Sequence, residues 1–285
     1  MTQDSPENPS NTQNPAQTPP QTQALVKNDV GDTDNTSTPS GSQRLVYYSV
    51  LAGLCPLIPV PFIDDLVLGY VRKRFFRGLF SDASLSLSDS QMDLILHEPG
   101  GCVFGCVSTV IFYPLKKIFR KVFFFLSIKG CVDVASKLFH QGFMLQKAIE
   151  AGHIDADLLA NPHNEQTLKP IVEATNNTLA QVDARPIEQV ISRTFSSSKR
   201  WMRRGARQLW GSFRQKRGQD SETIEEAIAH SPAADAQDMN AMVAVVDKAV
   251  WMQSDYLQIL EKTFFDNLAT AKQSTASPLK DPKND

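Results

Sequence analysis

The sequence predicts a mainly α-helical protein, with a bundle-like core that contains apolar hairpin segments, a disordered N-terminal leader and no β-sheet. Two observations support the helices. Apolar residues after residue 44 recur at intervals of three, four and seven, and prolines and glycines separate these stretches. A third observation supports the leader, because residues 1–43 consist mostly of Thr, Gln, Asn, Ser and Pro. Such a segment buries too little apolar surface to offset its conformational entropy.

The near-neutral net charge of −2 is a cancellation between regions of opposite charge. Residues 1–43 hold five acids and one Lys, residues 44–219 hold 23 bases and 14 acids, and residues 220–285 hold 12 acids and five bases. The average composition excludes a polytopic transporter and a wholly disordered chain, but it leaves open a protein that lies on a membrane.

We predict five regions along the chain. They are a disordered leader at 1–43, an apolar and basic membrane-facing region at 44–151, a region with a basic amphipathic helix at 152–219, an acidic helical region at 220–271 and a flexible tail at 272–285. The leader lacks the basic start and apolar core of a secretory signal and the Arg-rich character of a transit peptide. A cytoplasmic start is therefore expected.

The first apolar segment, 45–63, has no charged residue over 19 positions, which is long enough for a spanning helix. Three prolines at 56, 59 and 61 cannot continue an α-helix, so we expect a helix through Leu54 and an extended turn. A second helix begins at Asp64 or Asp65, whose carboxylates cap its first turn. They are the best polar candidates in the hairpin. Two interpretations stay open: a hairpin that dips into a membrane, and a buried helical hairpin of a soluble core.

The helix after Asp65 places Val67, Tyr70, Val71 and Phe75 on one side and ends in a basic, aromatic run at 72–77. This run is the first of three basic, aromatic clusters in the chain, and the others lie at 116–121 and 199–217. Lys and Arg beside apolar segments favour the cytoplasmic side of a membrane.

The second charge-free stretch, 99–115, contains Gly101 and Gly105, a spacing that lets two helices approach closely in lipid. A basic and aromatic segment follows it, and three consecutive Phe cannot all be hidden on one helical face. A long helix is predicted from Leu115 to about Ala151, with a bend or close contact at Gly130 and Gly142. The candidate membrane contacts here are Lys116, Lys117, Arg120, Lys121, Phe123, Phe124 and Phe125.

The basic helix lies between Gln189 and Gln219, a stretch with nine Lys or Arg and no acid. Asp183 is expected to be its N-cap, Pro186 to lie in its first turn, and Ser196–Ser198 to interrupt it. An apolar stripe then runs through Met202, Ala206, Leu209, Trp210 and Phe213, with arginines on the remaining surface. This pattern is typical of a helix that lies on an anionic membrane. The candidate contacts here are Arg203, Arg204, Arg207, Trp210 and Phe213.

Two alternatives exist for the basic helix. Its charge would also bind nucleic acid phosphate without sequence preference, but no known nucleic-acid-binding motif flanks it, so we do not predict nucleic acid as the partner. The stripe would otherwise pack on the core while the arginines meet the acidic C-terminal region.

The C-terminal region predicts one long helix from Asp235 to about Ala271. Its apolar seam has heptad-like spacing and favours a partner helix, either inside the chain or in a second copy that associates through 239–268. The seam consists of Val243, Val246, Val250, Leu257, Leu260 and Phe264, and Gln253 and Asn267 continue it.

No pattern in the sequence predicts an enzyme, a cofactor or a metal. The four cysteines, at 55, 102, 106 and 131, lack the paired spacing of a zinc site. The polar residues around 153–163 are interpreted as caps and linker residues. We therefore predict a non-enzymatic, membrane-associated helical protein on the cytoplasmic face, with a soluble helical scaffold as the alternative.

Overall fold

The computed structural model describes residues 41–58, 63–97, 120–160, 167–216 and 233–276, and it describes the backbone alone at 63, 120–127, 212–216, 233–238 and 275–276. These residues form ten α-helices and one short 3-10 helix, and none of them forms a strand, which confirms the mainly α prediction. They all belong to one compact unit, residues 39–285. The predicted leader at 1–43 and tail at 272–285 lie largely outside the described residues.

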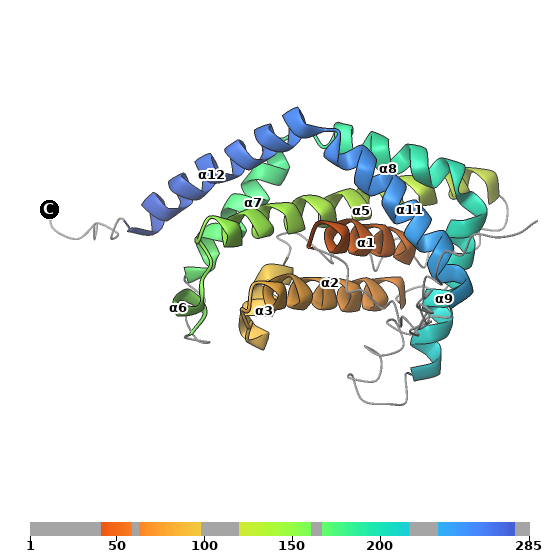
Figure 1. Cartoon of the computed structure of the whole chain (residues 1–285), viewed down its shortest axis with the longest axis horizontal. Helices are drawn as coiled ribbons and strands as arrows, with labels where there is room; N and C mark the ends of the chain where they lie inside the picture. The colour runs from red at the N-terminus through yellow and green to blue at the C-terminus, as the bar shows by residue number, and fades with distance from the viewer. Residues whose placement is uncertain (1–40, 59–62, 98–119, 161–166, 217–232, 277–285) are drawn as a thin grey trace, which may run out of the picture. The chain divides into compact units, whose positions relative to one another are not determined.

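Helix α1 (Gly41–Leu54) is a core helix that contacts α2, α5, α9 and α11 (Figure 1). It ends at Leu54 as predicted, and Pro56 follows in the short 3-10 helix η1 (Cys55–Leu57). Leu45, Val46 and Leu54 are fully buried. Each such side chain contributes about 1.5–3 kcal/mol through removal from water. Residues 45–58 are thus part of the protein core, as the alternative of a buried hairpin predicts.

Helix α2 (Ile63–Asp82) begins one residue before the predicted start, so that Asp64 and Asp65 lie in its first turn. Val67, Val71 and Phe75 face the core as predicted. The interpretation of 72–77 as a membrane-facing cluster changes, because Phe75 and Phe76 are both fully buried. The basic residues of this cluster contact neighbouring helices of the same chain: Arg72 donates to Gln141, Arg74 donates to Tyr48, Lys73 pairs with Asp93 and Arg77 pairs with Asp89.

Helix α3 (Asp89–Leu96) begins with a capping box in which Ser88 and Gln91 bond each other's backbone N–H groups. The fully buried Gln91 side chain also donates to the Leu159 carbonyl, which joins α3 to α6 (Ala156–Leu159). Asp155 is the N-cap of α6, in agreement with the interpretation of the polar residues around 153–163 as caps and linker residues.

Helix α5 (Arg120–Glu150) is one continuous helix where the sequence predicts a helix over 115–151. A Cβ atom on Gly142 would lie 2.4 Å from the Phe75 ring, so the predicted close contact is confirmed there. Gly130 has open space around it and needs no such explanation. The helix ends at Glu150, and Gly152, two residues further on, adopts the left-handed region with φ of 70° and donates to the Ile149 carbonyl.

Helices α7 (Lys169–Gln181), α8 (Arg185–Ser197) and α9 (Lys199–Lys216) follow. The predicted interruption at Ser196–Ser198 is confirmed, since α8 ends at Ser197 and α9 begins at Lys199. Asp183 is not the N-cap of α8, because that position is Ala184. Asp183 precedes the N-cap by one residue, and its carboxylate accepts a hydrogen bond from the backbone N–H of Arg185. It thereby satisfies one of the free N–H groups at the start of α8.

The prediction of one helix from Asp235 to Ala271 is wrong. Two helices, α11 (Ala233–Trp251) and α12 (Ser254–Ala276), meet at a break at Met252 and Gln253 (Figure 1). The break lets α11 pack on α1 and α8 while α12 packs on α7. The predicted seam is buried on both sides of the break, and Asn267 donates to Thr178 of α7, so the partner helices of the seam lie inside the chain.

Candidate binding face on helices α8, α9 and α11

The apolar stripe of α9 faces the protein core. Met202, Ala206 and Leu209 are buried, and Trp210 is half-buried and packs against the core. Helix α9 contacts η1, α1, α8 and α11 along this side. Most of the stripe that the sequence assigns to a membrane is therefore occupied by the chain itself. The side chain of Phe213 lies outside the described residues.

The opposite side of α9 carries an exposed basic row, which we define as Arg200, Arg203, Arg204 and Arg207. These residues are spaced three and four apart, so they share one helix face. The row covers about 11 Å of helix axis, at about 1.5 Å per residue. The Arg207 side chain donates to the Arg203 carbonyl at 3.2 Å, which holds it along the helix surface.

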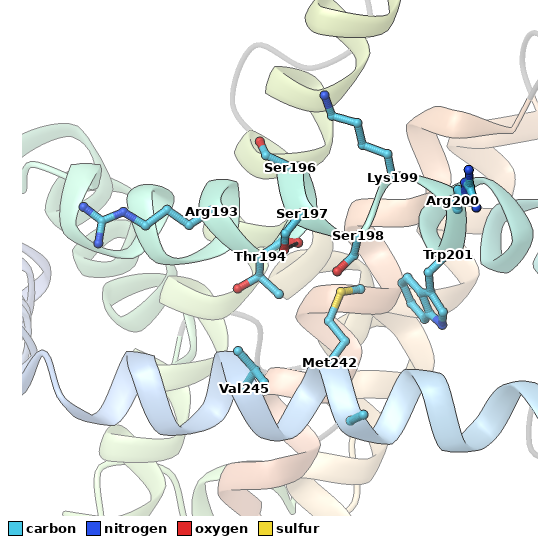
Figure 2. A pocket seen from close by; sticks show the side chains of 11 residues that line it. Arg193, Thr194, Ser196, Ser197, Ser198, Lys199, Arg200, Trp201, Met242 and Val245 are labelled. Carbon is cyan, nitrogen blue, oxygen red and sulfur yellow. Dashed lines mark hydrogen bonds between the residues drawn. The ribbon is translucent and has the colours of Figure 1, made fainter.

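An open cleft of about 770 Å³ lies where α8 turns into α9 and faces α11 (Figure 2). Its wall on the α8–α9 side is hydroxyl-rich, with Thr194 and Ser196–Ser198. Its α11 wall is apolar, with Ala241, Met242 and Val245. In Figure 2, the Met242 side chain points toward Ser198, and Trp201 points toward α11.

The cations of this cleft lie at its edge. Arg193, Lys199 and Arg200 line it, but Figure 2 shows Arg193 and Lys199 extending outward, away from Met242. The hydroxyls of Thr194 and Ser197 donate to the backbone carbonyls of Val190 and Thr194. The arrangement therefore presents an apolar and hydroxyl-lined floor with a positive rim, in contrast to a set of donors that converge on one anion.

A second cleft of about 360 Å³ shares Arg193 with the first and runs toward the α11–α12 break. It is lined by Pro186, Gln189 and Val190 of α8 and by Gln253. Arg185 and Asp183 also line it and pair with each other, with the Arg185 Nε to Asp183 Oδ2 distance at 2.7 Å. The two clefts thus follow one side of α8.

A buried polar network joins α5 to α12. His140, only 2% exposed, lies with its Nδ1 2.6 Å from the Ser136 carbonyl and its Nε2 in contact with the Tyr256 hydroxyl. A carbonyl only accepts, so Nδ1 carries the proton and Nε2 accepts from Tyr256. Burial lowers the pKa of His140 and raises that of Tyr256, which keeps both groups neutral. The network satisfies itself and is a structural link between the two helices.

The described cysteines are buried, free thiols. Cys55 and Cys131 are buried, and burial raises the pKa of both thiols, that of Cys131 to about 12. A thiol with such a pKa is protonated at neutral pH. Within the part of the chain that the structure describes, no group of His, Cys, Asp and Glu side chains has the arrangement of a metal site.

The remaining predicted contact residues are only partly described. Gly101, Gly105, Lys116 and Lys117 lie outside the described residues, as do the side chains of Arg120, Lys121 and Phe123–Phe125. Those predictions stay open. In the described ranges, no helix is both long enough and apolar enough to cross a membrane.

The clefts contain residues that the sequence reasoning missed. Arg193 does not belong to the predicted apolar stripe of the basic helix. Met242 and Val245 are near Val243 in the sequence but do not belong to the predicted heptad seam. One sequence signal could have indicated an exposed apolar row on these helices: Val245, Met252 and Ile259 recur every seven residues beside the seam. In the structure these three side chains are 58%, 72% and 58% exposed.

Comparison with known proteins finds no match among family models, curated proteins or solved structures. The class of protein is therefore defined by its own features: a helical protein whose described surface carries a basic row on α9 and a positively rimmed groove beside it.

Proposed function

We propose that this chain is a non-enzymatic protein that attaches peripherally to the cytoplasmic face of an anionic membrane through the basic row of α9. The observation that carries the proposal is the division of α9 into a buried apolar side and an exposed side with four arginines. A helix anchored in this way holds its charges at the surface of a rigid body. Anionic lipid headgroups are a partner that such a row attracts.

The attachment is electrostatic, because Met202, Ala206 and Leu209 already pack on the core and are not free to insert. Each base close to an anionic surface contributes about 1 kcal/mol, so the row contributes about 4 kcal/mol in total. Surface charges are screened over about 8 Å at physiological salt. The attachment should therefore be reversible by salt.

Vesicle sedimentation tests this proposal. We expect the full chain to pellet with vesicles that contain about 30% phosphatidylserine and not with phosphatidylcholine alone, and to be released by about 0.5 M salt. The triple variant Arg203→Gln/Arg204→Gln/Arg207→Gln should bind about a hundredfold more weakly, since it loses three bases at about 1 kcal/mol each.

A matched variant controls for total charge. Lys129→Gln/Lys248→Gln/Lys262→Gln removes three positive charges from exposed positions on α5, α11 and α12. It should bind the vesicles nearly as the natural chain does. Equal weakening by the two triple variants, or tighter binding of duplex DNA than of the vesicles, would rule out the membrane proposal.

A second candidate, a helical interaction module, is favoured by a separate observation. Residues 45–58 and the aromatic residues of 72–77 lie in the core, so these apolar segments serve the fold, whereas the groove beside α8 is open and partly apolar.

A further inference from the structure

Helix α8 lines both clefts with a single face. Pro186, Gln189, Val190, Arg193 and Thr194 follow each other at alternating intervals of three residues and one, while Ile187, Ile191 and Phe195 on the adjacent side are buried in the core. The lining residues run from 186 to 197, which is about 17 Å at about 1.5 Å per residue. The two clefts share Arg193 and lie in succession along this face of α8, and together we call them the α8 groove.

The wider end of the α8 groove has apolar residues on its α11 side. Val245 lines it and is 58% exposed, beside the buried Met242 and the half-buried Trp201. At the other end, Met252 is 72% exposed and precedes the lining residue Gln253. Large apolar side chains that gather at a hollow on the surface mark a place where another molecule is bound.

The rim of the groove is basic. Arg193, Lys199 and Arg200 line its wider end, and in Figure 2 the side chains of Arg193 and Lys199 extend away from α11 at the edge of the cleft. A small phosphate compound would need these donors to converge. A longer ligand with an apolar side and acidic flanks matches the floor and the rim at once.

From this complementarity we propose that the α8 groove binds an acidic amphipathic helix of a partner protein. A helix of about three turns fits the groove length, with apolar residues at i, i+3, i+4 and i+7 on the floor and Asp or Glu on both flanks. Met242, which lines the groove, suits this role because methionine adapts its shape to different apolar partners. The groove shares Arg200 with the basic row of α9, but Arg203, Arg204 and Arg207 do not line it.

The proposal is tested with designed peptides of about 16 residues that carry a fluorescent label. One has Leu at the four floor positions and Glu on the flanks, a second replaces Glu by Lys, and a third replaces Leu by Ser. Fluorescence anisotropy with the full chain measures their affinity. We expect the acidic Leu peptide to bind at least about tenfold more tightly than either of the others.

Matched variants locate the binding. Val245→Glu should weaken binding of the acidic Leu peptide about tenfold or more, whereas Ile259→Glu, the same change at a residue that is also 58% exposed but does not line the groove, should not. Arg193→Gln should weaken it several-fold, whereas Lys129→Gln on α5 should not. Circular dichroism confirms that each variant keeps its helical content.

The remaining outcomes overturn the proposal. Equal affinity for the acidic and basic peptides, no measurable binding, or equal losses from Val245→Glu and Ile259→Glu would each reject it. A dimer that dissociates in Val245→Glu would assign the groove to a second copy of the chain. Loss of vesicle binding in Val245→Glu would assign it to the membrane. The triple Arg203/Arg204/Arg207 variant should bind the peptide normally, so this proposal and the proposed membrane attachment fail independently.

Discussion

The hydroxyl of Tyr256 on α12 donates a hydrogen bond to the imidazole of His140 on α5, across 116 residues of sequence. The bond lies where the chain has just turned from α11 into α12, beside the rings of Phe139 and Trp251. It ties the C-terminal helix to the long central helix by a buried polar contact. Removing either partner leaves the other without its hydrogen bond in a site shielded from water.

We expect Tyr256→Phe to lower the free energy of unfolding by about 1–3 kcal/mol, because it leaves the buried His140 Nε2 without a donor. Urea denaturation followed by circular dichroism measures the change. Tyr47→Phe is the matched control, since the half-buried Tyr47 hydroxyl has no hydrogen-bond partner among the described residues. A loss of the same size in both variants would show that the Tyr256 hydroxyl contributes nothing specific.

Stability should fall as the pH is lowered from about 7.5 to 6. Burial lowers the pKa of His140 below its ordinary value of 6.5, and burial and Lys272 together lower that of the more exposed His153. The unfolded chain then binds more protons than the folded chain at these pH values, so acid favours unfolding. The stability that the neutral histidines contribute is fully present above the pKa of histidine in the unfolded chain, and it is lost as the pH falls from that value toward the lower pKa in the folded chain.

The variant His140→Gln tests the assignment of this pH dependence. Its free energy of unfolding at pH 7.5 should be lower than that of the natural chain, but it should change less between pH 7.5 and 6. An unchanged pH slope would assign the dependence to other groups.

Two glycines of α5 should respond to alanine in opposite directions. At Gly142 a Cβ atom would lie 2.4 Å from the Phe75 ring and 2.5 Å from Leu45 Cδ1, so Gly142→Ala should cost about 1–3 kcal/mol by forcing the core apart. At Gly130 a Cβ atom meets no atom within 4 Å, so Gly130→Ala should stabilise the helix by up to about 1 kcal/mol. Thermal melts distinguish the two, and a stabilised Gly142→Ala would contradict the packing of α1 and α2 on α5.

The ion pair between Arg44 and Asp82 should stabilise the protein more than an exposed pair does. Its N–O distance is 3.0 Å, and the Arg44 side chain is only 11% exposed. Removal of Asp82 leaves that charge poorly solvated, so Asp82→Ala should cost about 1–2 kcal/mol. Asp266→Ala breaks the exposed pair with Lys262 and should lower the free energy of unfolding by a few tenths of a kcal/mol at most, because exposed ion pairs contribute little to stability. Similar urea midpoints for the two variants would count against a distinct role for Arg44.

The predicted helix ends were mostly correct because local chemistry decides them. Prolines after Leu54, the acids at 64 and 65 and the serines at 196–198 mark helix ends in the sequence and in the structure. The break between α11 and α12 was missed for the same reason. The seam passes from Val250 to Leu257 in one heptad step and contains no proline or glycine, so nothing local indicates that the chain turns there.

In the candidate site, too, one part could be predicted from the sequence and another part depends on tertiary packing. The exposed arginines of α9 follow from the sequence, since four bases at helical spacing opposite an apolar stripe must lie on one face. The α8 groove does not follow from it. Arg193 comes from one helix and Val245 from another, and their approach depends on how α11 packs against α8.

The sequence by itself determined that this protein is helical, where most of its described helices begin and end, and which sides of them are apolar or basic. The tertiary structure alone decided what covers each apolar side. The hydrophobic effect has no direction, so periodicity shows that a face is buried without showing whether a membrane, a partner or the chain itself buries it. In α1, α2 and α9 it is the chain itself.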